Sequence, residues 1–173
     1  MKRLGFLAVG FASLALLAGC SSNGERVEKY REALDRAKLS LKQSVGVAES
    51  ETDGSVAVKA KLLVDAEPVF SVGTLASSAA KDVRVDIVTG KVLSASVVGG
   101  SSSLCPGSVS LSEAIAVAEG EVGGAAVSIQ PDDDGACALE VQVLSGDTLW
   151  EVKVGANGSV LETEEADDDE GDD

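Results

Sequence analysis

The sequence predicts an α+β protein made of two tandem small units, each with a helix packed on an antiparallel sheet. Three observations lead to this prediction. The chain of 173 residues has room for one domain or two small ones. A segment with helical spacing and a helix-start pattern occurs twice, about 70 residues apart. Each copy is followed by short strand-like runs that close on a glycine-containing turn.

The two expected helices share a start signal and an apolar pattern. Ser40 with Gln43, and Ser110 with Glu113, match a capping box, in which the serine oxygen accepts a free backbone N–H and the third residue reaches back. The apolar residues at helical spacing are Leu41, Val45 and Ala48 in the first copy, and Leu111, Ile115 and Ala118 in the second.

Each copy ends in a pattern typical of a β-hairpin. Thr89-Gly90 and Asn157-Gly158 are turn dipeptides that readily adopt positive φ. The expected strand pairs are 83–85 with 91–93, and 149–154 with 159–161. Alternation along the third of these runs places Trp150, Val152 and Val154 on one face and Leu149, Glu151 and Lys153 on the other.

These strand-like runs resemble the PepSY family. The residues that carry the resemblance are Val69-Phe70-Ser71-Val72, Val85-Asp86-Ile87-Val88-Thr89-Gly90-Lys91-Val92 and Trp150-Glu151-Val152. The resemblance covers about residues 40–97 and 109–164, and the second copy departs from it by having Val154 and Ser159 in the terminal hairpin. It implies a layout that is cystatin-like in general, and non-catalytic modules related to the propeptides of secreted peptidases. A chance repeat of common cap and turn residues is the alternative.

The first twenty residues predict where the protein is located. Lys2 and Arg3 precede 15 uncharged residues, fewer than the roughly 20 that span a bilayer, which is typical of a secretory signal. Leu17-Ala18-Gly19-Cys20 resembles the lipobox of bacterial lipoproteins. The resemblance implies removal of residues 1–19, lipidation of Cys20 by acyl groups such as palmitate, and anchoring on the extracytoplasmic side of a bacterial membrane. An ordinary signal peptide with an incidental cysteine is the alternative.

The expected domain organisation follows from these segments. A polar tether, 20–24, leads into 25–97, which holds an N-terminal helical segment and the first unit. A linker, 98–108, precedes the second unit, 109–161. The helical segment has apolar residues at seven-residue positions, and we expect this stripe to pack on the sheet. Whether residues 25–50 form one helix or two is left open at this point. The stripe consists of Val27, Tyr30, Leu34, Ala37 and Leu41.

Charge is strongly unbalanced along the chain. The formal net charge is −15, with 14 Lys and Arg against 29 Asp and Glu, which disfavours nucleic acid as a partner. The last twelve residues, 162–173, contain nine acids and are expected to form a disordered tail. The tail either solubilises the protein or docks a cationic partner or divalent ions.

No catalytic site is expected. The chain has no histidine, which excludes imidazole as a base or metal ligand. Ser78-Ala79-Ala80-Lys81 matches a serine acyl-enzyme pattern but lacks its companion motifs. Asp132-Asp133-Asp134 lacks the first and last ligands of a calcium loop, so it is either a weak cation site or a solvated turn. We therefore expect no enzyme, no cofactor and no specific metal site.

Two cysteines remain once Cys20 is assigned to lipid. Cys105 and Cys137 form an even pair in a compartment where thiols oxidise, and we expect a disulfide between them. Two buried free thiols are the alternative.

The sequence thus predicts an envelope lipoprotein whose PepSY-like modules bind, or inhibit, a secreted peptidase or another envelope protein. The alternative is a structural or cation-buffering lipoprotein that acts through its acidic C-terminal region.

Overall fold

The computed structural model describes residues 22–76, 79–99, 105, 107–132 and 137–166. Within these residues, no helix is both long and apolar enough to cross a membrane. The helices are α1 (Ser22–Arg36), α2 (Leu41–Ser50) and α3 (Leu111–Val122). The strands are β1 (Val56–Leu63), β2 (Val69–Ala76), β3 (Ala79–Asp86), β4 (Val92–Val98), β5 (Ala125–Pro131), β6 (Leu139–Ser145), β7 (Thr148–Val154) and β8 (Val160–Glu165).

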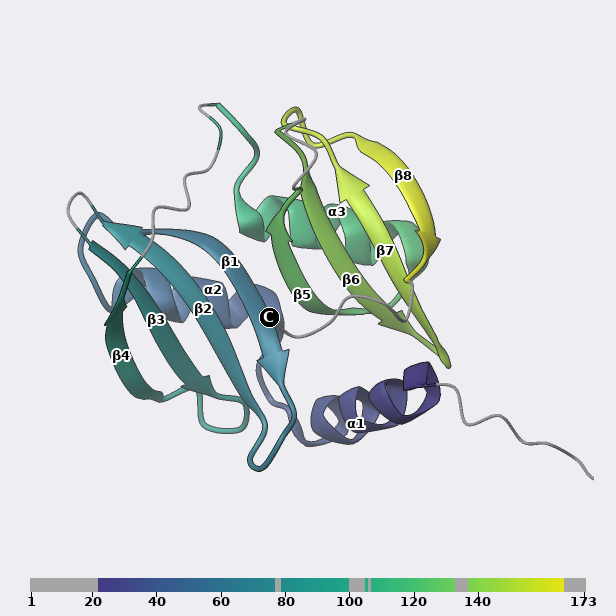
Figure 1. Cartoon of the computed structure of the whole chain (residues 1–173), viewed down its shortest axis with the longest axis horizontal. Coiled ribbons are helices and arrows are strands. Elements are labelled where there is room, and N and C mark those ends of the chain that lie inside the picture. The colour runs from purple at the N-terminus through teal and green to yellow at the C-terminus, as the bar shows by residue number, and fades with distance from the viewer. Residues whose placement is uncertain (1–21, 77–78, 100–104, 106, 133–136, 167–173) are drawn as a thin grey trace, which may run out of the picture.

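The strands form one antiparallel sheet in the order β4-β3-β2-β1-β5-β6-β7-β8. Helices α2 and α3 pack side by side on one face of it (Figure 1). The predicted α+β class, with helices packed on an antiparallel sheet, is confirmed. The sequence did not indicate that β1 and β5 would pair and so join all eight strands into a single sheet.

The predicted helix starts are confirmed. Ser40 and Ser110 each accept a hydrogen bond from the backbone N–H three residues on, and Gln43 and Glu113 each accept the N–H of the capping serine. Helix α3 ends at Gly123, whose φ of 69° is a left-handed conformation that glycine adopts without strain.

Glycines with positive φ also occur in the turns of the two predicted hairpins. Gly90 and Gly158 have φ values of 69° and 77°. Their amides donate to the carbonyls of Asp86 and Gly155, which begin the two turns. In the first turn, the Asp86 carboxylate also accepts hydrogen bonds from the backbone and side chain of Thr89, which hold the pKa of Asp86 below its usual value.

The structure contains two helix-and-strand sets that match in detail. The first set is α2 with β1–β4, and the second set is α3 with β5–β8. Ala57 pairs with Thr74 just before a β-bulge, and Ala126 pairs with Val143 just before another. Each position in β5–β7 therefore matches the position 69 residues earlier in β1–β3. The amides of Ala57 and Ala126 both donate to a glutamate near the end of the preceding helix.

The core lies between the sheet and the helices α2 and α3. Alternate residues of the strands turn toward the helices, as the period-2 pattern requires. The largest fully buried core side chains include Phe70, Leu41, Ile87, Leu111, Ile115, Ile129, Val72, Val83, Val85 and Val141. Val152 and Val154 are also fully buried, on the face that alternation along their strand predicted.

Residues 25–50 form two helices rather than one. The helix is interrupted between α1 and α2, where the amides of Lys38 and Leu39 both donate to the carbonyl of Ile87. Helix α1 lies beyond the ends of the strands (Figure 1), and its Arg31 binds the carbonyl of Gly146 and the carboxylate of Asp147 in the β6–β7 turn. The predicted apolar stripe joins the core, with Val27 buried and Tyr30, Leu34 and Ala37 partly buried.

The sheet continues further toward the C-terminus than the sequence suggested. The acidic tail was expected from residue 162, but β8 runs to Glu165, where it pairs with Trp150 of β7. Ala166 is buried, and its amide donates to the carbonyl of Leu149. Backbone pairing with β7 accounts for this difference, because it gives the N–H and C=O groups of an acidic segment regular partners. Residues 167–173 lie outside the described residues.

Candidate functional site

One face of the sheet is turned away from α2 and α3 and carries mostly polar side chains. We call it the polar face and define it by Lys61, Arg84, Gln130, Glu140, Glu151 and Lys153. These residues alternate with core residues such as Val83, Val141 and Val152, so they project from the opposite side. Since the other face is occupied by helices, the polar face and the two sheet edges are the broad surfaces that the strands offer to a partner.

A cluster of charged groups lies in the second helix-and-strand set. The ammonium of Lys153 is 3.4 Å from a carboxylate oxygen of Asp132 and 3.9 Å from one of Glu140. Gln130 donates a hydrogen bond of 3.3 Å to the other oxygen of Glu140. Register explains the arrangement, because Gln130 lies opposite Glu140 and Glu140 lies opposite Lys153 on neighbouring strands.

The cluster can hold a proton near neutral pH. Burial raises the pKa of Glu140 to about 7, and the nearby carboxylates of Glu151 and Asp132 act in the same direction. The hydrogen bond from Gln130 opposes these effects. The carboxyl of Glu140 therefore keeps its proton to a higher pH than an ordinary glutamate does.

The matching positions of the first set carry a simpler polar group. Ser71, Asp82 and Arg84 stand where the second set has Glu140, Glu151 and Lys153. The Ser71 hydroxyl donates to Asp82, and the guanidinium of Arg84 lies 3.5 Å from the same carboxylate. An acid next to a base thus recurs on the polar face of both sets, but the pair is partly exposed in the first set and mostly buried in the second.

The structure places the residues predicted from the sequence as follows. Cys105 and Cys137 are joined by a disulfide with a Cα–Cα distance of 5.5 Å. Asp132 is buried beside Lys153 rather than solvated in a turn. Cys20, Asp133 and Asp134 lie outside the described residues. Among the described residues, no group of three or more Cys, Asp or Glu side chains is arranged to hold a metal ion.

Sequence reasoning missed the cluster around Glu140. The alternation along 149–154 did assign Glu151 and Lys153 to one face, but the strand that holds Glu140 was not aligned with it. Pairing these two strands as a hairpin around Gly146 would have placed Glu140 beside Lys153.

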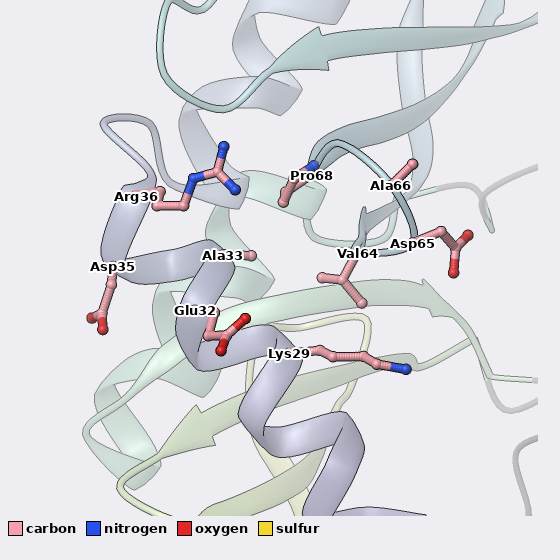
Figure 2. Close-up of a pocket in the computed structure, with 9 residues that line it drawn as sticks. All are labelled: Lys29, Glu32, Ala33, Asp35, Arg36, Val64, Asp65, Ala66 and Pro68. Atoms are coloured by element: carbon pink, nitrogen blue, oxygen red, sulfur yellow. The ribbon is translucent and has the colours of Figure 1, made fainter.

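A shallow groove of about 530 Å³ runs between α1 and the β1–β2 turn (Figure 2). Lys29, Glu32 and Arg36 line it on the helix, and Asp65 lies on the opposite side. None of its lining residues is a serine, threonine or cysteine, so the groove lacks a hydroxyl or thiol nucleophile. Its mixed charges suit contact with another polar chain better than enclosure of a small molecule.

The sheet has two outer edges, which differ in chemistry. Strand β4 has the sequence VLSASVV, without charge, and exposes Leu93, Val97 and Val98. Strand β8 has the sequence VLETEE and exposes Leu161 and three glutamates. Each edge strand pairs on one side only within the described sheet, so each presents backbone groups on which another strand can add.

Comparison with known proteins gives a family match for the second set. Residues 108–164 match the family model described as peptidase propeptide and YPEB domain, PepSY. The search of curated proteins found no match. A crystal structure of a candidate lipoprotein from Clostridium difficile 630 is similar over 75% of this chain and 95% of that one, with 17% identity and a TM-score of 0.47. A likeness at that level carries no conclusion about this chain. The PepSY family match spans α3 and β5–β8, the helix and four strands of the second set.

Proposed function

We propose that this protein is an envelope lipoprotein, anchored through lipid on Cys20, whose PepSY-like units are non-catalytic binding modules for a secreted peptidase. The observation that carries the proposal is the PepSY domain at 108–164, because the family is described by the propeptides of peptidases. The lipobox-like segment ending at Cys20 supports the anchor. Within 25–97, we assign the part that follows the N-terminal helix, about 40–97, to the first unit by its detailed match to the second set.

The polar face is the surface we assign to the partner. Helices α2 and α3 occupy the other face of the sheet, so a large protein reaches the strands from the polar side (Figure 1). In the first set this face carries the exposed cations Lys61 and Arg84, while the second set carries the Glu140 cluster. Charges of both signs on one face favour a protein partner with its own mixed charge over a polyanion.

The test measures peptidase inhibition directly. The chain from residue 21, which contains every residue that the structure describes, is added to the secreted proteins of the source bacterium. Peptidase activity should fall and should be recovered in complex with the chain. If activity is unchanged and no peptidase co-purifies, the proposal is wrong.

A pair of charge reversals tests the surface. Arg84→Glu on the polar face should weaken inhibition, because it adds an anion where the partner meets a cation. Lys42→Glu reverses an exposed charge on α2, on the opposite side of the sheet, and should leave inhibition unchanged. Equal effects of the two variants would show that the polar face is not the contact surface.

The second candidate function assigns the activity to the acidic C-terminal region as a structural or cation-buffering element. The net charge of −15 and the exposed glutamates of β8 favour it. Shortening the chain to end at Ala166 separates the two candidates. Ala166 is kept because it is buried and bonded to Leu149. Loss of cation or partner binding in the shortened chain supports the acidic region, and retention of peptidase inhibition supports the PepSY-like modules.

A further inference from the structure

We propose that the edge strand β4 pairs antiparallel with β4 of a second copy of this chain, about a two-fold axis through Ala95. The partner is therefore the protein itself, and the two sheets become continuous. The proposal does not rest on the proposed function, because it is argued from the edge strand alone.

The first argument is the exposure of β4. Leu93, Val97 and Val98 are 56%, 72% and 42% exposed, and they are three of the five large apolar side chains that the described residues expose. The strand has no charged residue, no proline and no glycine. Proteins usually protect a sheet edge with charge, proline, a β-bulge or a covering segment. The register of β4 shifts against β3 between Ser94 and Val92, which leaves residues 94–98 as a regular, uncharged edge. An uncharged edge of this kind favours addition of a strand.

The second argument is the self-complementary sequence of β4. In an antiparallel pair centred on Ala95, Ser94 lies opposite Ser96 of the other copy, and Leu93 lies opposite Val97. Val92 is left out of this pairing, because the register of β4 against β3 shifts between Ser94 and Val92. The remaining pairs join side chains of the same kind. A two-fold interface requires this kind of self-complementarity.

The neighbouring strand adds to the fit. Arg84 of β3 lies beside Ser94, and Asp82 lies beside Ser96. In the proposed register, the row that holds Arg84 in one copy continues through the two serines to Asp82 in the other. The two charged side chains are three strand spacings apart, so their attraction is weak, but the row places no like charges opposite each other.

The opposite edge strand, β8, is not suited to the same kind of self-pairing. Thr163 of β8 matches Ala95, since each lies opposite an equivalent buried valine of the preceding strand, Val152 or Val83. Pairing of β8 with itself about Thr163 would place Glu162 opposite Glu164 and so oppose like charges. The charge pattern therefore permits self-pairing at β4 and disfavours it at β8.

The chain already contains a junction of the proposed kind. Strands β1 and β5 occupy matching places in the two sets and pair antiparallel. Ala60 pairs with its own match, Ile129, as a local two-fold axis requires. The helices of both sets remain on one face of the sheet, and the proposed dimer would preserve the same arrangement (Figure 1). Because two seven-residue strands bury little area, we expect a weak dimer that forms as concentration rises.

Cysteine cross-linking tests the register. In the chain from residue 21, Ala95→Cys places two thiols next to each other across the proposed axis. Under mild oxidation it should give a several-fold higher yield of disulfide-linked dimer than Thr163→Cys, the matched change on β8. Equal yields from the two variants would overturn the proposal. A dimer formed mainly between mixed Ala95→Cys and Thr163→Cys chains would also overturn it, because that contact joins different edges.

A second pair of substitutions tests the edge itself. Leu93→Lys and Leu161→Lys change apolar residues at matching positions with nearly equal exposure, 56% and 57%. Added to Ala95→Cys, Leu93→Lys should cause a several-fold loss of cross-linked dimer, since a lysine protects a sheet edge. Leu161→Lys should leave the yield unchanged. Circular dichroism confirms that each variant is folded, and a Leu93→Lys chain that is folded and still cross-links as well as its parent would overturn the proposal.

Discussion

Loss of the disulfide between Cys105 and Cys137 should destabilise the protein by about 3–4 kcal/mol. The bridge joins residues 32 positions apart and so closes a loop that contains α3 and β5. On the chain-entropy model, a closed loop of that length restricts the unfolded chain and stabilises the folded one by about 3–4 kcal/mol at room temperature. A small domain has a total stability of about 5–15 kcal/mol, so the loss should be a large fraction of the whole.

Urea unfolding followed by circular dichroism measures this loss. The double variant Cys105→Ser/Cys137→Ser should unfold at a clearly lower urea concentration than the unchanged chain, with little change in the spectrum of the folded state. A reducing agent should lower the midpoint of the unchanged chain to that of the variant and leave the variant unaffected. Equal midpoints, or two free thiols in the denatured unreduced protein, would refute the reasoning.

Three further predictions concern other positions. Burial raises the pKa of Glu140 from 4.5 to about 7, so the stability that its neutral form provides is lost as pH rises between these values. Urea unfolding at a series of pH values should show a smaller loss in Glu140→Gln, and a loss of unchanged size would contradict the assignment. A Cβ at Gly124 would overlap the backbone carbonyl oxygen of Leu144 in β6, so Gly124→Ala should destabilise by about 1–3 kcal/mol. Gly120→Ala, in open space on α3, should instead stabilise by about 0.5–1 kcal/mol, and thermal unfolding that ranks the two alanines the other way would contradict this account. Ser40→Ala and Ser110→Ala should each cost about 1 kcal/mol in the same assay, and no cost at either position would show that the caps do not contribute.

Much of the local structure could be predicted from the sequence, because it depends on residues that are neighbours along the chain. The capping boxes at Ser40 and Ser110 need only a serine and an acceptor three residues on. The turns at Gly90 and Gly158 need a residue that tolerates positive φ. The apolar buried positions of α2 and α3, and Val152 and Val154 of β7, follow from side-chain period, whereas Leu149 is buried out of phase with its strand.

The charged cluster on the polar face could be predicted only in part. Alternation assigned Glu151 and Lys153 to one face, but the position of Glu140 depends on how β6 is aligned with β7. The pKa of Glu140 depends in addition on burial, which is a property of the folded chain. Asp132 looked like part of a solvated acidic turn, and it became buried because β5 carries it beside Lys153.

By itself, the sequence determined local elements of this protein: its helix starts, its turns and the alternation of faces along 149–154. Only the tertiary structure decided that β1 pairs with β5, that β8 extends to Glu165 and that β4 is left as an uncharged edge. The physical reason is that backbone N–H and C=O groups are the same in every residue. Which two strands form hydrogen bonds with each other therefore depends on how the whole chain packs, and not on a pattern within either strand.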